Sequence, residues 1–126
     1  GSDWLDGSGN MIVNNEITIE NTPAHSYAFC TDTMYNEALI KKIKGVDLLY
    51  HEATFKKELS ERAKETGHST THQAAHIAKR AKVKLLITGH YSQRYTDLNV
   101  LLEESKQYFN NSFLTKEGDV FDFNTF

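Results

Sequence analysis

The sequence predicts a single α/β domain built on a mostly parallel sheet covered by helices. Three short apolar runs, residues 26–30, 46–50 and 83–88, alternate with segments of helical periodicity. Nearly continuous apolar runs of this length are typical of parallel strands that are buried on both faces. A chain of 126 residues with 39% hydrophobic and 25% charged side chains has the size and composition of one globular domain.

The N-terminal part is expected to lie outside the main sheet. Residues 1–10 contain three glycines and show no periodicity, so we expect a flexible lead-in, whose opening Gly-Ser resembles the remnant of a tag. The domain proper is expected over residues 11–126. At its start, residues 11–20 alternate enough to predict a strand or one arm of a hairpin.

Two helices are predicted on either side of the second apolar run. Residues 35–44 have an apolar stripe followed by Gly45, which is typical of a helix with a glycine C-cap. Residues 55–65 read as a polar helix that ends at Gly67. These helices supply the crossover that a parallel sheet requires.

The remaining elements follow in the same alternating order. Thr70 and Gln73 form a capping-box pattern that opens an alanine-rich helix over residues 71–82. A longer helix is predicted over residues 97–110. The last segment, residues 112–123, has Lys-Glu-Gly-Asp between two apolar stretches and predicts a C-terminal hairpin.

Charge and cysteine content exclude several classes of protein. The net charge is −3, but eleven of the fourteen basic side chains lie within residues 41–84. We interpret them as the solvated outer faces of helices, with a polyanion-binding surface as the alternative. No apolar run is long enough to span a membrane. The single cysteine, Cys30, excludes an internal disulfide and a zinc site built from cysteines, and is compatible with a reducing compartment.

Polar side chains follow each of the three central strands. Asp32 follows the first, His51 and Glu52 end the second, and His90 follows the third. Because ligands bind at the carboxyl ends of parallel strands, these side chains and nearby His68 are candidate metal ligands and acid–base groups. The alternative is that each is an ordinary turn residue or a structural hydrogen-bonding group.

Two further histidines, His72 and His76, stand four residues apart on the predicted alanine-rich helix. This spacing resembles a zinc-binding pair, but no glutamate stands between them in the usual place. An ordinary helix face is therefore the preferred interpretation.

The segments around the strand ends resemble a known family. Residues 27–33, 45–55, 68–75 and 87–95, with their H-E-A-T, H-S-T and G-H-Y-S-x-R-Y elements, resemble the C-terminal part of ribonuclease Z. That family comprises tRNA 3′-processing endonucleases of the metallo-β-lactamase superfamily, and the similarity runs from Asn10 to the end of the chain. The resemblance implies the C-terminal half of a metallo-β-lactamase αββα sandwich.

The resemblance also implies a role for each candidate residue. Asp32 corresponds to the carboxylate that bridges two zinc ions, and His90 to a ligand of one of them. His68 corresponds to the general acid that protonates the leaving 3′-oxygen, and Glu52 to the carboxylate that orients it. Arg94 is a candidate phosphate-binding residue.

By this resemblance the parent protein is a cytoplasmic, zinc-dependent endoribonuclease that removes 3′ trailers from precursor tRNA, and His51 is structural. The family's H-x-H-x-D-H motif is absent from this sequence. We therefore expect the 126 residues alone to hold zinc weakly, to be inactive, and to cover an exposed sheet face by forming a homodimer.

Three alternative functions remain open. The chain could be a non-catalytic structural half-domain, or it could belong to another phosphodiesterase or small-molecule hydrolase of the same superfamily. An RNA-binding module without chemistry is the weakest, because the net charge is −3.

Overall fold

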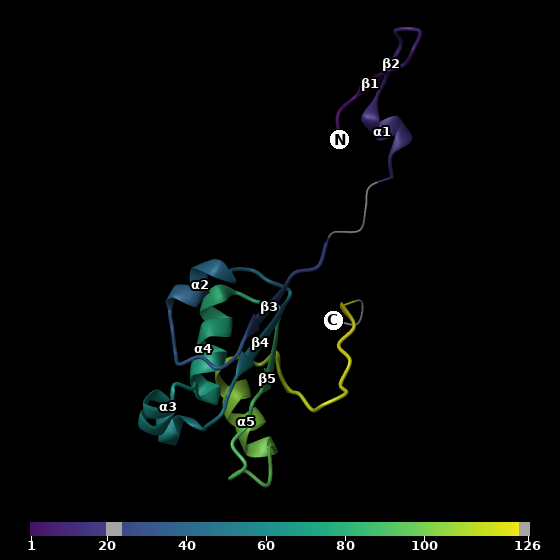
Figure 1. The fold of residues 1–126 in the computed structure, drawn as a ribbon. Coiled ribbons are helices and arrows are strands. Elements are labelled where there is room, and N and C mark those ends of the chain that lie inside the picture. Colours follow the sequence, from purple (N-terminus) through teal and green to yellow (C-terminus); the bar gives the residue numbers. More distant parts are fainter. Residues whose placement is uncertain (20–23, 124–126) are drawn as a thin grey trace.

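A four-stranded parallel sheet forms the centre of the molecule (Figure 1), seen in a computed structural model that describes residues 1–19 and 24–123. Neighbouring strands run in the same direction throughout, so their carboxyl ends meet at one edge. The strands, in their order across the sheet, are β3 (Tyr27–Cys30), β4 (Leu48–Glu52), β5 (Leu85–Gly89) and β6 (Ser112–Leu114). The predicted α/β fold with a mostly parallel sheet is confirmed.

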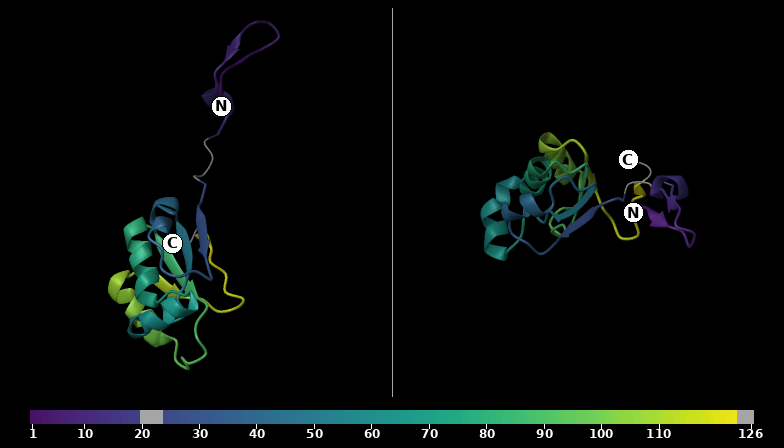
Figure 2. Two further views of the ribbon diagram at one scale, coloured as in Figure 1. Left: turned by 60° about the vertical axis from the view of Figure 1, so that its left-hand side comes forward. Right: turned by 90° about the horizontal axis from the view of Figure 1, so that it is seen from above.

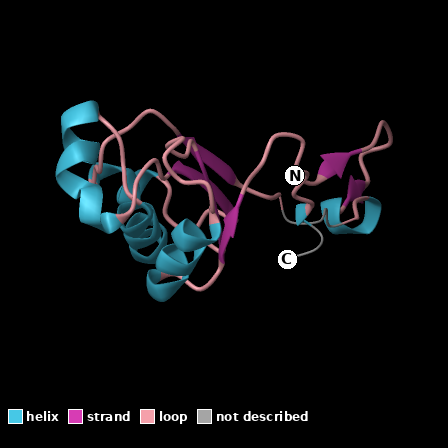
Figure 3. Cartoon of the chain, turned by 90° about the horizontal axis from the view of Figure 1, so that it is seen from below, coloured by secondary structure: helices cyan, strands magenta, loops and turns pink. Residues whose placement is uncertain are grey.

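Helices lie on one side of this sheet, as Figures 2 and 3 show. The buried core on that side joins Leu49 and Leu86 of the sheet to Ala75, Ala78 and other small residues of one helix. Because alanine side chains are short, this helix can approach the sheet closely. The helical elements are α2 (Ala38–Lys42), the 3₁₀ turn η1 (Lys57–Leu59), α3 (Ser60–Thr66), α4 (Thr71–Ala81) and α5 (Asn99–Tyr108).

The start of α4 is fixed by the predicted capping box. The Thr70 side chain accepts a hydrogen bond from the Gln73 amide, and the Gln73 side chain accepts one from the Thr70 amide. These reciprocal bonds satisfy amide groups that a helix start leaves without partners. They also fix the loop of His68 and Ser69, which directly precedes the cap.

The opposite face of the sheet is only partly covered. Leu48, Leu85 and Ile87 are buried there, with Phe121 and Phe123 of the C-terminal segment packed over them. The large side chains nearer the sheet's two edges remain open to solvent: Tyr27 is 52%, Phe29 60% and Phe113 43% exposed. This face therefore presents exposed aromatic side chains at both edges of the sheet, Tyr27 and Phe29 on β3 and Phe113 on β6.

The predicted C-terminal hairpin is wrong. The turn forms, since the Asp119 amide donates to the Lys116 carbonyl, but within the described residues no strand follows it. Strand β6 instead pairs in parallel with β5. Phe121 and Phe123 pack onto the sheet face, so their apolar side chains are buried without a returning strand.

The N-terminal segment stands apart from the sheet (Figure 1). Residues 1–10 were expected to be a loose lead-in, but β1 (Trp4–Leu5) pairs antiparallel with β2 (Met11–Ile12). The intervening turn is held by the Asp6 carboxylate, which accepts hydrogen bonds from nearby amides. Of the segment predicted as strand, residues 11–19 are described; they contribute a two-residue hairpin arm, followed by the short helix α1 (Asn14–Ile17).

None of the helices within residues 1–19 and 24–123 has the length and apolar character needed to cross a bilayer.

Candidate functional site

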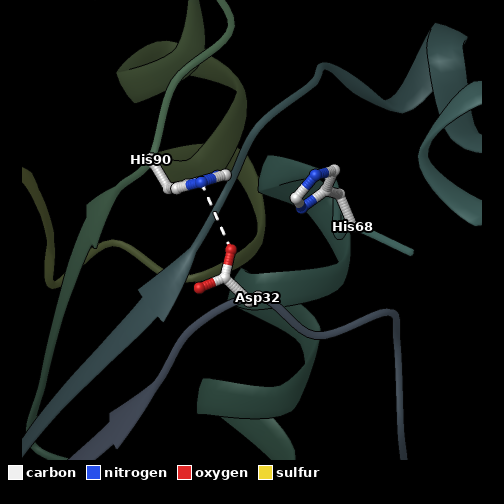
Figure 4. Close-up of side chains that lie close together, drawn as sticks. All are labelled: Asp32, His68 and His90. Carbon is white, nitrogen blue, oxygen red and sulfur yellow. Dashed lines mark ion pairs between the residues drawn. The ribbon is translucent and has the colours of Figure 1, made fainter. Parts of the chain in front are cut away.

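Asp32, His68 and His90 converge at the carboxyl edge of the sheet (Figure 4). One ligand atom from each lies within 4.8 Å of the others. His90 Nε2 is 3.4 Å from Asp32 Oδ1, and the rings of His68 and His90 are 4.9 Å apart between centroids. The three residues that the sequence placed after separate strands or before α4 therefore share one small space.

Two of these residues adopt an unusual backbone conformation. Asp32 has φ of 46° and His90 has φ of 61°, both in the left-handed region that residues other than glycine seldom occupy. Each follows its strand within two residues, so the turn points the side chain across the sheet edge. Strained backbone of this kind costs about 1–3 kcal/mol and is concentrated at functional sites.

Glu52, at the end of β4, is fully buried and contacts His68 of the cluster. Its Oε1 accepts from the Thr33 amide at 2.6 Å and faces His68 Nδ1 at 3.1 Å. Its Oε2 accepts from the Ser69 amide at 2.9 Å and from the Thr54 hydroxyl at 3.0 Å. One carboxylate thus joins the loop after β3, the loop after β4 and the loop before α4.

The contact with Glu52 determines how His68 is oriented. A carboxylate oxygen only accepts, so Nδ1 of His68 carries the proton that faces it. The other ring nitrogen, Nε2, is then directed away from the carboxylate. The side chain is only 23% exposed, so its orientation is held by the protein rather than by solvent.

Thr54 makes the corresponding contact on the other histidine. Its Oγ1 lies 2.9 Å from His90 Nδ1 and 2.9 Å from the His90 carbonyl oxygen. Sequence reasoning missed Thr54, Thr33 and Ser69 as supporting residues. Thr54 and Ser69 stand inside the H-E-A-T and H-S-T elements, which was the available signal. The contacts of Thr54 with His90 and of Ser69 with Glu52, however, join residues 36 and 17 positions apart.

The donor set at the site suits a divalent transition metal. A carboxylate oxygen and two imidazole nitrogens are ligands that zinc accepts, and three protein ligands with an open position are typical of a catalytic zinc. Among residues 1–19 and 24–123 this is the only cluster of three such side chains. Three ligands suit one ion, so a two-ion centre needs more ligands than the described part of the chain offers.

His72 and His76 do not extend this site. Their rings are 6.2 Å apart, and no third ligand within the described ranges joins them. His72 packs edge-on against Tyr108 of α5 at 4.3 Å, and burial followed by the charges of Lys57 and His76 lowers the pKa of its ring. The pair belongs to the packing between α4 and its neighbours.

The other two residues singled out in the sequence, Arg94 and His51, make side-chain contacts outside the cluster. The Arg94 guanidinium stacks over the Phe55 ring at 5.2 Å and contacts Ser92. His51 is fully buried, its Nδ1 donates to the Glu52 carbonyl, and burial lowers the pKa of its ring. These contacts agree with a structural role for His51.

Comparison with known proteins places the chain in a family. The sequence model described as Beta-lactamase superfamily domain matches residues 12–91. Ribonuclease Z of Bacteroides thetaiotaomicron is 44% identical over 126 residues, which is 100% of this chain and 40% of that protein. Ribonuclease Z of Porphyromonas gingivalis strain W83 is 47% identical over 117 residues, covering 93% of this chain and 38% of that protein.

Solved structures give the same family. The metallo-beta-lactamase fold protein YhfI of Bacillus subtilis matches with a TM-score of 0.73 and 25% identity, over 79% of this chain and 40% of that one. The short form of human tRNase Z matches with a TM-score of 0.54 and 32% identity, over 70% of this chain and 29% of that one.

The resemblance inferred from the strand-end motifs is confirmed. The chain spans about two fifths of the length of the curated relatives it matches, and corresponds to the C-terminal portion of ribonuclease Z. Sheet topology, motifs and sequence similarity agree that this chain belongs to the beta-lactamase superfamily.

Proposed function

We propose that this chain is the C-terminal portion of a zinc-dependent endoribonuclease that removes 3′ trailers from precursor tRNA. The observation that carries the proposal is the convergence of Asp32, His68 and His90 over the buried Glu52. The names of its relatives support the substrate, since curated proteins called ribonuclease Z match most or all of the chain.

Each residue in the cluster has a distinct role in this proposal. Asp32 and His90 would hold zinc, which supplies Lewis-acid polarisation of the scissile phosphate and a water of lowered pKa. His68 gives the proton on Nε2 to the 3′-oxygen as the bond between phosphorus and that oxygen breaks. Glu52 holds His68 in position and attracts the positive charge of its protonated ring. Arg94, four residues after His90, would contact a phosphate of the substrate.

The isolated 126 residues would not carry out this reaction. With His68 serving as the acid, Asp32 and His90 are the only zinc ligands in the cluster, fewer than the three per ion of a catalytic zinc site, so we propose that the chain alone binds zinc weakly and leaves RNA uncleaved. The exposed Tyr27 and Phe29 side chains on β3 would be covered by a second copy, which gives a homodimer. A cytoplasmic location accords with Cys30, which is a free thiol.

A precursor-tRNA cleavage assay with zinc tests the proposal. We expect no product from the chain alone, and product of mature 3′ length when an N-terminal half carrying H-x-H-x-D-H is added. Asp32→Ala and His68→Ala in the reconstituted protein should remove the activity, whereas Lys44→Ala, at the opposite end of the sheet, should not.

Two results would contradict the proposal. Cleavage that persists at full rate in Asp32→Ala would separate the cluster from the chemistry. Hydrolysis of bis(p-nitrophenyl) phosphate without any cleavage of precursor tRNA would favour a different phosphodiesterase of the superfamily, a candidate kept open by the higher TM-score of the YhfI match.

A further inference from the structure

Thr54 is a buried hydroxyl that lies between Glu52 and His90. Its side chain belongs to a residue only 6% exposed. Its Oγ1 is 3.0 Å from Glu52 Oε2, 2.9 Å from the His90 carbonyl oxygen and 2.9 Å from His90 Nδ1. Three polar atoms therefore surround one hydroxyl that has a single proton to donate.

Counting protons assigns the direction of these hydrogen bonds. A carboxylate oxygen and a carbonyl oxygen can only accept, and the charged carboxylate is the stronger acceptor, so the Thr54 proton goes to Glu52. If the proton went to His90 Nδ1 instead, Oγ1 would face both oxygens at 2.9–3.0 Å with no hydrogen between them. The favourable arrangement has Nδ1–H of His90 donating to Oγ1. The neutral ring then carries its lone pair on Nε2.

Nε2 is the atom that faces the rest of the cluster. It lies 3.4 Å from Asp32 Oδ1, and the side chain of His90 is 41% exposed on that side. In the metal-free chain Asp32 could accept a proton from Nε2, but this contact is long and the Asp32 side chain is 71% exposed, whereas the Thr54 contact is 2.9 Å and that residue is buried. The Thr54 hydrogen bond is therefore the stronger of the two. A lone pair on Nε2 is also the state of imidazole that binds a metal.

We propose that Thr54 is a positioning residue that fixes His90 as the Nδ1–H tautomer. Through it a single buried carboxylate, Glu52, orients both histidines of the site: His68 directly and His90 by way of the Thr54 hydroxyl. The assignment of a metal to His90 rests on the proposed function. The tautomer follows from the hydrogen bonds of this chain alone.

Long-range ¹H–¹⁵N NMR of the metal-free chain, at a pH where the rings are neutral, reads the tautomer directly. We expect Nδ1 of wild-type His90 in the range of a protonated ring nitrogen and Nε2 in the range of an unprotonated one. Thr54→Ser keeps the hydroxyl and should retain this pattern. Thr54→Val should shift both nitrogens toward the averaged values of a ring free to exchange tautomers.

A matched control separates this effect from general loss of a buried hydroxyl. Thr71 is also fully buried, and its hydroxyl donates to the carboxylate of Glu104, away from His90. Thr71→Val should therefore leave the His90 pattern unchanged. A protonated Nε2 in the wild-type chain would overturn the proposal without any variant, as would an unchanged His90 pattern in folded Thr54→Val.

The outcome is independent of the proposed nuclease activity. Absence of tRNA cleavage together with an Nδ1–H tautomer would reject the function and keep the role of Thr54. If both hold, zinc titration of the reconstituted protein should show affinity reduced about 10–100-fold in Thr54→Val, the usual effect of losing a partner of a metal-binding histidine.

Discussion

The substitution Glu52→Gln replaces one carboxylate oxygen with an NH₂ group and keeps the shape of the side chain. Oε1 of Glu52 accepts from the Thr33 amide, and Oε2 accepts from the Ser69 amide. An amide side chain has only one accepting oxygen. In one orientation the NH₂ group faces the Ser69 amide, and in the other it faces the Thr33 amide, so one buried N–H loses its partner in either case.

The size of the effect follows from this count. A buried donor left without a partner costs about 1–3 kcal/mol. The remaining hydrogen bonds lose the assistance of a charge, which roughly halves their strength and adds about 1 kcal/mol or more. We therefore expect Glu52→Gln to lower the free energy of unfolding by about 3 kcal/mol, a large share of the roughly 5–15 kcal/mol available to a domain.

Urea unfolding followed by circular dichroism measures this change. With a slope of about 1–3 kcal/mol per molar urea, the midpoint should fall by about 1–3 M. Glu104→Gln makes the same chemical change at a half-buried carboxylate that accepts from the Lys57 amide, and should cost less than about 1 kcal/mol. If Glu52→Gln unfolds within about 0.5 kcal/mol of wild type, the buried carboxylate does not organise the site as argued.

Four further predictions follow from burial and exposure. Burial lowers the pKa of His51 below the unfolded value, so the unfolded chain binds more protons below about pH 6.5. Its contribution to stability should be present at pH 7.5 and decline at 5.5 in urea unfolding, with a smaller decline in His51→Gln. Leu86→Ala, at a fully buried position, should cost about 2–5 kcal/mol in the same assay, while Val120→Ala, at an exposed one, should cost less than about 0.5 kcal/mol. Sedimentation velocity should show concentration-dependent dimers that Phe29→Lys abolishes; a wild-type chain that stays monomeric would contradict the proposed homodimer. Calorimetry should find zinc affinity weaker than micromolar, and submicromolar binding would show that this chain's own ligands suffice.

The parts of the fold predicted correctly are those with local signals. The three central strands are short apolar runs, and the start of α4 is a four-residue capping pattern, so each can be recognised within one segment. In the C-terminal segment the local apolar pattern is compatible with two different structures. The apolar residues Phe121 and Phe123 fit a returning strand as well as a cover for the sheet face, and only the neighbouring strands decide between them.

The candidate site also has a part that the sequence predicts and a part that it does not. The rule for parallel sheets brings Asp32 and His90 to one edge, because that rule depends only on strand direction. The partners of Glu52 could not be predicted, because the Thr33 and Ser69 amides come from loops 19 and 17 residues away in the sequence. Backbone amides also leave no signature in a sequence, since every residue except proline has one.

This chain contains all the hydrogen-bond partners that the structure gives Glu52, but it does not contain a full set of metal ligands. All four donors to Glu52 belong to described residues of the same chain, so the orientation of His68 depends on nothing outside it. With His68 as the acid, the cluster leaves Asp32 and His90 as zinc ligands, fewer than the three that a catalytic zinc site uses. Folding and preorganisation of the acid should therefore survive in the 126 residues under conditions where metal binding does not. Measuring the His68 ring resonances and zinc affinity on the same sample would separate the two properties, since the first should be native-like and the second weak.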